Sequence, residues 1–427
     1  MSRKEEFIPA GRAELVELCL REGKLTGADA ADFSRFASAL AAYYHYDFHR
    51  KLEGLKRDYR PFNPDRDGSG DEKDSTRLFQ AVEEILERAN YEPISAGELR
   101  TALREESLVD LRTSVEFDDF ERVLFYHRGE GETELEERRF FFWKRRRKFG
   151  MLRRVVLLIL FKNENYFRDQ GRDPDDLNFL PGRINAYLYK NVPRFDLELL
   201  FPNLKIGMNR KDLFLFVAPA LAAIGSVVYK ILPQLSIVTA AVLQYFLGAE
   251  AVRNMDVSQE QIRDVMPVFL ALLSASVALG GVAVRQYNSY RRKRLNFQKK
   301  ISDTLFFRNL STNAGVFHEL IDAAEEEECK ELILVYYLLL TKGGAVKTEE
   351  LNRMAEDWTE TTFGERIDFD STVPLSRLKT IGEAGGHSLL SRDENGEVTV
   401  HSLTEALDTL SIVWDNLKPS REDKINA

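Results

Sequence analysis

The chain has 427 residues, of which 44% are hydrophobic and 30% are charged, and its formal net charge is −9. This length exceeds that of one ordinary domain. The two cysteines, Cys19 and Cys329, lie far apart and lack the spacing of a metal site, which excludes a disulfide framework and favours a reducing compartment. The stretch Met1–Leu20 lacks the continuous apolar core of a secretion signal, so we expect it to stay where it is made.

Residues 1–90 are predicted to form a helical N-terminal region. Apolar residues recur at helical spacing from Phe7 to about Tyr59, which predicts two or three helices. The segment Asn63–Ser75 is polar and rich in Gly, Pro and Asp, which is typical of a loop, and another helix is expected over about Thr76–Asn90.

Residues 91–210 are predicted to form an α+β region around a small antiparallel sheet. Between Ser107 and Lys162, apolar runs alternate with Gly-containing turns, as in strands joined by hairpins. The run Val155–Phe161 is rich in β-branched residues and too short to cross a bilayer, so it is interpreted as a buried strand.

A basic and aromatic stretch, Arg138–Arg154, lies within this region. Its composition suits nucleic acid or anionic lipid headgroups, whereas strand alternation would make it an ordinary sheet face with its bases in solvent. The candidates for contact with lipid headgroups are Lys144, Arg145, Arg146, Arg147 and Lys148.

Residues 211–286 are predicted to be a membrane block. Two apolar spans are predicted, at about 213–231 and 265–284; their uncharged runs, Leu213–Tyr229 and Val265–Val284, are near the length of a membrane span. A shorter run at 235–248 is a third span, a re-entrant piece or an interfacial helix.

Bases on both sides of this block predict its topology, because Lys and Arg beside apolar spans stay on the cytoplasmic side. Both flanks then lie inside, which favours a hairpin in a cell inner membrane with cytoplasmic termini, or in an organelle membrane of a eukaryote; three spans remain the alternative. The topology-determining residues are Arg210, Lys211, Arg291, Arg292, Lys293 and Arg294.

Residues 287–345 are predicted to be a helical connector, with one helix over Leu305–Leu340 whose acidic stretch, Glu325–Glu328, is interpreted as a solvated face. Residues 346–420 follow a helix, helix, hairpin, helix order with an Asn395–Gly396 turn, which suggests a winged-helix-like domain. Seven bases against fifteen acids in Lys347–Lys418 make nucleic acid an unlikely partner and favour a protein partner.

Other patterns predict no site. His45 and His49 share a helix face, but further metal ligands are lacking, so packing is favoured. The stretch from Asp65 to Asp71 begins like a calcium loop but has Thr76 where the bidentate Glu belongs, so a solvated linker is favoured. No phosphate-binding loop or nucleophile motif occurs, so catalysis is not expected and no catalytic, cofactor or metal residue is assigned.

Two central segments, Pro181–Asn203 and Asp303–Leu339, resemble the transmembrane protein 143-like family, a group of membrane proteins with a domain of unknown function. The likeness extends to Phe7–Leu20, Tyr59–Asp65 and Ile412–Leu417, and covers nearly the whole chain. The resemblance implies a membrane protein with paired soluble regions and implies no activity.

The predicted fold class is therefore α+β and mostly helical: an N-terminal helical region with a small antiparallel sheet, a transmembrane helical hairpin and a C-terminal winged-helix-like domain. The predicted function is that of a membrane-anchored interaction or regulatory protein, with an oligomeric channel or transporter component as the alternative. The predicted partners are membrane lipids, a protein bound through the C-terminal domain and, as an open alternative, a second copy of the chain through Ser274, Ser276, Gly280 and Gly281.

Overall fold

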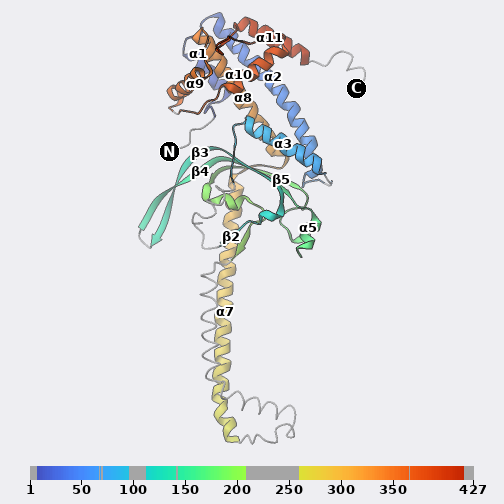
Figure 1. The fold of residues 1–427 in the computed structure, drawn as a ribbon. Helices are drawn as coiled ribbons and strands as arrows, with labels where there is room; N and C mark the ends of the chain where they lie inside the picture. Colours follow the sequence, from blue (N-terminus) through green and yellow to red (C-terminus); the bar gives the residue numbers. More distant parts are fainter. Residues whose placement is uncertain are drawn as a thin grey trace. The chain divides into compact units, whose positions relative to one another are not determined.

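The computed structural model of the chain describes residues 7–66, 68, 71–95, 112–140, 143–207, 259–364 and 366–417 (Figure 1). The chain divides into two compact units. Unit 1 comprises Met1–Glu105, Glu116–Asn203 and Phe307–Ala427, and unit 2 comprises Glu106–Val115 and Leu204–Phe306. Each unit is described by itself below.

Unit 1 begins with helices that the apolar spacing predicted. Helices α1 (Arg12–Arg21) and α2 (Ala28–Tyr59) confirm the two helices expected before Tyr59, and α3 (Glu72–Arg88) confirms the next. Along α2 every third or fourth residue is an apolar side chain that is almost fully buried. These buried residues are Phe33, Phe36, Leu40, Tyr44, Phe48, Leu52 and Leu55.

Helix α8 (Ala314–Lys342) is the central helix of unit 1. From Leu332 to Leu339 every side chain is at most 4% exposed, so this half of the helix is surrounded on all sides. The helix ends at Gly343, whose φ of 69° gives the left-handed turn that commonly terminates helices. Helices α1, α2, α3, α9 and α10 contact α8.

The sheet of unit 1 has five antiparallel strands in the order β1-β3-β4-β5-β7. The long hairpin β3–β4 confirms the antiparallel sheet predicted for this region. The strands are β1 (Glu92–Pro93), β3 (Phe120–Phe140), β4 (Trp143–Phe161), β5 (Ile184–Pro193) and β7 (Asn309–Thr312).

Both faces of the sheet are covered, which explains the unbroken apolar run of β4. Val156, Leu158 and Leu160 belong to the core shared with α2, α3 and α8, which lie on one side of the sheet (Figure 1). The alternate residues face the other side, where the Phe161 ring stacks on Phe179 at 3.7 Å. That side is covered by α5 (Glu164–Asp169) and by the short 3-10 helices Phe117–Asp119, Pro174–Asp176 and Arg194–Leu200.

The predicted connector helix over Leu305–Leu340 is wrong in one respect, because it is interrupted. Strand β7 ends the preceding helix and pairs with β5, so that Leu188 lies opposite Ser311. The β-branched Thr312 and the Asn309 and Asn313 that bracket the strand favour this break. Asn313, with φ of 51°, turns the chain from β7 into α8.

The C-terminal part of unit 1 has its elements in the predicted order. Helices α9 (Thr348–Phe363) and α10 (Thr372–Ala384) precede a hairpin of β8 (Leu390–Arg392) and β9 (Val398–Val400), and α11 (Leu403–Leu417) follows. Gly396, with φ of 80°, occupies the predicted turn. Val346 forms an additional bridge to Val398, which ties the hairpin to the end of α8.

Unit 2 contains the short antiparallel pair β2 (Arg112–Ser114) and β6 (Lys205–Gly207) and most of the 50-residue helix α7 (Gln259–Arg308). The predicted run 265–284 is part of α7, which continues through the strongly basic stretch beyond it. The runs 213–231 and 235–248 lie outside the described residues.

The predicted membrane hairpin is wrong. Within the described ranges, no helix has both the length and the apolar character needed to cross a bilayer. The apolar run 265–284 does not stand alone as a span, because the same helix carries many charged side chains. Three further predictions depended on such spans: the membrane-anchored function, the channel or transporter alternative and the integral membrane location. They are therefore wrong as well.

Candidate functional site

The acidic stretch of α8 is buried, so its interpretation as a solvated face is wrong. Glu327 and Glu328 are 0% and 2% exposed, and Lys330 on the next turn is 3% exposed. The apolar second half of α8 fixes the helix in the middle of unit 1, and Glu327–Lys330 directly before it are enclosed as well, whereas His318, Glu319 and Asp322 nearer the helix start are exposed. Buried charges are costly unless they are paired, so the partners of these residues define a site. We call Arg88, Arg128, Glu327, Glu328, Lys330, Glu331 and Arg377 the ionic cluster.

Two arginines from different elements hold Glu328. Arg88 of α3 binds it in a two-pronged manner: its Nη2 donates to Oε2 at 2.7 Å and its Nε donates to Oε1. Arg377 of α10 approaches Oε1 at 2.8 Å. The Arg88 guanidinium also lies 4.2 Å from the centroid of the Phe48 ring. This carboxylate therefore joins α8 to α3 and α10 through bidentate, charge-assisted hydrogen bonds.

Glu327 points toward a different set of groups. Its Oε2 lies 2.9 Å from Lys330 Nζ and 3.1 Å from Arg128 Nη2 of strand β3, and its Oε1 accepts a hydrogen bond from the backbone N–H of Ile8 at 2.8 Å. Lys330 in turn donates to the backbone carbonyl of Ile8 at 2.7 Å. Glu327 and Lys330 together therefore bind both the backbone N–H and the backbone carbonyl of Ile8, which is far away in the sequence.

Glu331 has the most unusual proton affinity of the cluster. Burial and, to a smaller extent, the neighbouring carboxyls of Glu327 and Glu328 together raise the pKa of its carboxyl to about 8, although a hydrogen bond from Asn90 opposes the shift. Asn90 Nδ2 donates to Glu331 Oε1 at 2.9 Å. At neutral pH the Glu331 carboxyl is therefore mainly protonated.

The arrangement suits a structural or switching role better than catalysis. Glu327 and Glu328 are each occupied by two cations, so neither carboxylate is available as a base for a substrate. Within the part of the chain that the structure describes, no three His, Cys, Asp or Glu side chains converge as metal ligands. The burial of these acids could have been inferred from the long apolar run that follows them in the sequence. A helix that is apolar on every side must be enclosed on every side.

The two histidines of α2 lie as their spacing predicted. The rings of His45 and His49 stack with centroids 6.4 Å apart, and His45 Nδ1 lies 3.1 Å from Glu325 Oε2. His45 therefore contacts the start of the acidic stretch. In the loop before α3, Asp65 accepts a hydrogen bond from Asn313 Nδ2 at 3.0 Å, which ties this loop to the turn before α8.

The basic run of β4 lies opposite an acidic run of β3. The strand register pairs Lys144 with Arg138, Arg147 with Leu135, and the bases Arg145, Arg146 and Lys148 with Glu137, Glu136 and Glu134. Lys148 Nζ lies 2.9 Å from Glu132 Oε2, one position further along the same face. In this backbone register, three of the five bases that suggested lipid headgroups are paired with acidic residues of β3.

The residues chosen for topology are only partly described. Arg291, Arg292, Lys293 and Arg294 are exposed on α7 in unit 2. Arg210 and Lys211 lie outside the described residues. The four consecutive bases cover most of the circumference of the helix, because successive residues are about 100° apart.

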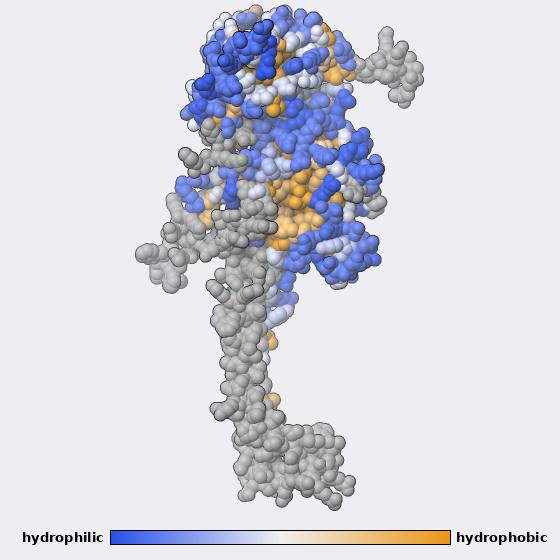
Figure 2. Space-filling model, in the orientation of Figure 1, coloured by the Kyte–Doolittle hydropathy of each residue, from blue (hydrophilic) through white to orange (hydrophobic). Residues whose placement is uncertain are grey.

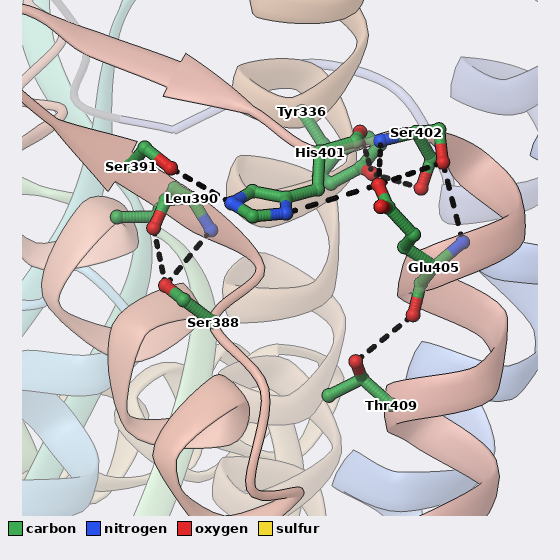
Figure 3. A network of polar contacts seen from close by, with 8 residues as sticks. All are labelled: Tyr336, Ser388, Leu390, Ser391, His401, Ser402, Glu405 and Thr409. Atoms are coloured by element: carbon green, nitrogen blue, oxygen red, sulfur yellow. Dashed lines mark hydrogen bonds and ion pairs between the residues drawn. The ribbon is translucent and has the colours of Figure 1, made fainter.

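A polar network closes the β8–β9 hairpin against α11 (Figure 3). His401 Nε2 lies 2.8 Å from Ser391 Oγ, and its Nδ1 lies 3.8 Å from Glu405 Oε2. A serine, a histidine and a carboxylate in this order are typical of hydrolases, and the sequence analysis missed them. However, 3.8 Å is too long for the hydrogen bond that orients a catalytic imidazole.

Glu405 instead caps α11. Its Oε2 accepts hydrogen bonds from the backbone N–H of Ser402 at 3.0 Å and from Ser402 Oγ at 2.8 Å, which is a capping box (Figure 3). The hydrogen bonds from the side chain and the backbone of Ser402 lower the pKa of Glu405. Tyr336 of α8 donates to the carbonyl of His401 at 2.8 Å and fixes the same corner from below. We call Tyr336, Ser391, His401, Ser402 and Glu405 the clasp, because their contacts hold the β8–β9 hairpin against α8 and α11.

An aromatic pair is exposed where α11 packs on α2. The Tyr46 and Trp414 rings meet edge to face with centroids 6.3 Å apart, yet they are 36% and 42% exposed. Ile412 of α11 is 39% exposed. Figure 2 shows isolated hydrophobic areas near the end of α11 within a mainly hydrophilic surface, and a larger hydrophobic area over the sheet. We call Tyr46 and Trp414, whose rings are in contact, the aromatic surface.

The comparison with protein families gives a partial match. Residues 152–315, from β4 into the start of α8, match a family described as "Protein of unknown function (DUF3754)". No solved structure matches the chain. The family match covers less than half of the chain and brings no activity with it, and the resemblance to the transmembrane protein 143-like family stays a prediction.

Proposed function

We propose that this chain is a protein-binding module in which the aromatic surface and the acids of α11 bind a basic segment of a partner protein. The observation that carries the proposal is the exposed contact between Tyr46 and Trp414. Trp and Tyr supply most of the binding energy in many protein interfaces, because they bury a large area with few rotatable bonds.

Charge favours a basic partner. The three acids of α11, Glu405, Asp408 and Asp415, are all exposed, and the helix contains no Lys or Arg. Two bases elsewhere in the C-terminal region are held by internal ion pairs: Arg366 by Glu356 at 2.7 Å and Arg377 by Glu328 at 2.8 Å. An approaching cationic segment therefore meets an excess of negative charge, which favours association with it over an acidic competitor.

The surface is also held rigidly. The clasp fixes the start of α11, and the buried face of the helix, which includes Ala406, Leu410 and Val413, packs into the core of unit 1. Rigid presentation of anchor residues reduces the entropy lost on binding. Arg50 and His49, one turn beyond Tyr46 on α2, are also exposed, and they border the acids with positive or titratable groups.

The test is binding of a defined cationic helix. A fluorescein-labelled amphipathic peptide of Leu and Lys is titrated with the full chain, and its anisotropy is compared with that of a Leu and Glu peptide of the same length. We expect the Lys peptide alone to bind. Trp414→Ala should weaken binding by about tenfold or more, since loss of an interface anchor costs on the order of 2 kcal/mol.

Val373→Ala is the matched control, because Val373 is 49% exposed on α10 and lies outside the aromatic surface. Its affinity should equal that of the unaltered chain. Equal binding of both peptides, or equal loss with Trp414→Ala and Val373→Ala, would contradict the proposal.

A further inference from the structure

The segment Phe7–Arg12, which precedes and enters α1, is held in the manner of a bound peptide. Phe7–Gly11 lie outside any helix or strand, and yet Ile8 is only 1% exposed. The Phe7 ring faces the Arg128 guanidinium, whose central carbon lies 4.7 Å from the ring centroid. This contact is a cation–π interaction, which adds to the burial of the segment.

Side chains of α8 bind the backbone of this segment. Glu327 accepts from the N–H of Ile8 at 2.8 Å, Lys330 donates to its carbonyl at 2.7 Å, and Glu326 accepts from the N–H of Arg12 at 2.5 Å. The last contact caps the first turn of α1, where a negative charge is favourable. The Ile8 carbonyl also accepts an internal backbone hydrogen bond, from the N–H of Ala10 at 2.9 Å.

The site stays charge-balanced without the segment. If Ile8 leaves, Glu327 keeps its ion pairs with Lys330 at 2.9 Å and with Arg128 at 3.1 Å, so no buried charge is stranded. A stranded buried charge is the usual reason why such a contact cannot open. Departure costs the burial of Ile8, the contact of Phe7 with Arg128, the ion pair of Arg12 with Glu325 at 3.5 Å and a few hydrogen bonds, which a second peptide of the same kind would restore.

We propose that Glu326, Glu327 and Lys330 form a peptide-binding site on α8 that the segment Phe7–Arg12 occupies in cis and that the same segment of a second copy of the chain can occupy in trans. The ligand class is an extended peptide with an aliphatic residue four positions before a helix start. Exchange between copies would link two chains by swapping one short segment. The proposal is independent of the aromatic surface.

The experiment uses a labelled peptide of residues 7–16 (FIPAGRAELV) and full chains whose own segment is weakened. Ile8→Asp places a carboxylate in the buried position and should release the segment. We expect the peptide to bind this variant at least tenfold more tightly than the unaltered chain, where the cis segment competes. A peptide carrying the same Ile8→Asp change should not bind.

Lys330→Met in the Ile8→Asp chain removes the donor to the Ile8 carbonyl and should weaken peptide binding by about tenfold, as expected for a charge-assisted hydrogen bond. Lys342→Met is the matched control on the same helix, because Lys342 is exposed and pairs only at the surface, with Glu350 at 3.1 Å. It should leave peptide binding unchanged.

If the Ile8→Asp chain does not fold, the milder Ile8→Ala chain replaces it. The midpoint of thermal unfolding of the Ile8→Ala chain should rise as peptide is added, because a ligand that binds the folded state stabilises that state. A folded Ile8→Asp or Ile8→Ala chain that shows no peptide binding would overturn the proposal. Equal weakening by Lys330→Met and Lys342→Met would overturn it as well.

Discussion

Asn90, in the turn after α3, donates a hydrogen bond to Glu331 of α8 across 2.9 Å. This bond reaches a carboxyl that lies beside Glu327 and Glu328 and that holds its proton at neutral pH. Asn90 adopts φ of 55°, a conformation that Asn tolerates better than most residues. The contact therefore joins a helix end to a carboxyl whose pKa is raised to about 8.

The stability of unit 1 should fall as pH rises toward 8. The unfolded chain releases the Glu331 proton near the ordinary pKa of 4.5, whereas the folded chain keeps it to about 8. Between these values the folded state binds more protons, so its stability decreases by up to about 1.4 kcal/mol per pH unit. Chemical denaturation at several pH values measures this slope.

Glu331→Gln should remove that contribution. The amide oxygen still accepts from Asn90, and no charge forms at high pH. We expect the variant to be as stable as the unaltered chain near pH 5 and more stable near pH 8.5. Identical pH profiles for the two proteins would show that Glu331 does not titrate as described.

Removal of Arg88 should be among the most destabilising changes in the chain. Arg88→Met leaves the buried Glu328 with Arg377 alone, and breaking a buried pair costs about 3 to 5 kcal/mol. The measurement is the free energy of unfolding by urea. Arg35→Met is the control, because the Arg35–Asp32 pair is solvent-exposed and its loss should be hardly measurable.

Two helical glycines should respond to alanine with opposite signs. A Cβ at Gly54 of α2 meets nothing within 4 Å, so Gly54→Ala should stabilise the chain by about 0.5 to 1 kcal/mol. A Cβ at Gly382 of α10 would lie 2.7 Å from the backbone nitrogen of Leu389, so Gly382→Ala should destabilise it despite the better helix propensity. Thermal unfolding of both variants checks the pair, and a shared sign would refute the steric argument.

Loss of the Tyr336 hydroxyl should loosen the hairpin without disturbing the core. Tyr336→Phe keeps a fully buried ring that packs 4.2 Å from Phe36, and it removes the hydroxyl that donates to the His401 carbonyl at 2.8 Å and to the Ser402 carbonyl at 3.5 Å. We expect a loss of about 1 kcal/mol. Hydrogen exchange of the β8–β9 amides should accelerate, while that of the α2 amides should stay unchanged apart from the global shift. Unchanged exchange at the hairpin would argue against the clasp.

Local pattern predicted much of the fold. Apolar residues spaced like Phe33, Phe36 and Leu40 predicted α2, and Asn395–Gly396 predicted the hairpin turn, because in both cases neighbours in sequence determine the structure. The burial of Glu327 and Glu328 was missed because their cations, Arg88, Arg128 and Arg377, come from three distant elements. A run of acids is usually solvated, and only tertiary structure shows otherwise.

The membrane prediction was wrong for a related reason. The length and apolarity of the run at 265–284 were judged in isolation, whereas the structure places it within a 50-residue helix. The aromatic surface was also missed, because nothing in the spacing of Tyr46 and Trp414, far apart in sequence, shows that their rings meet.

Helix α8 makes unit 1 difficult to divide. Tyr337 donates to Glu22, which follows α1, at 2.6 Å, and the adjacent Tyr336 donates to the His401 carbonyl after β9. One turn of α8 therefore binds both an N-terminal and a C-terminal segment of the chain. Trp358 of α9 donates to the same Glu22 at 2.6 Å. A fragment cut near residue 346 would expose the apolar sides of α9, α10 and α11 to water. Residues 346–420 should therefore aggregate when expressed alone and regain solubility when co-expressed with the preceding part of the chain.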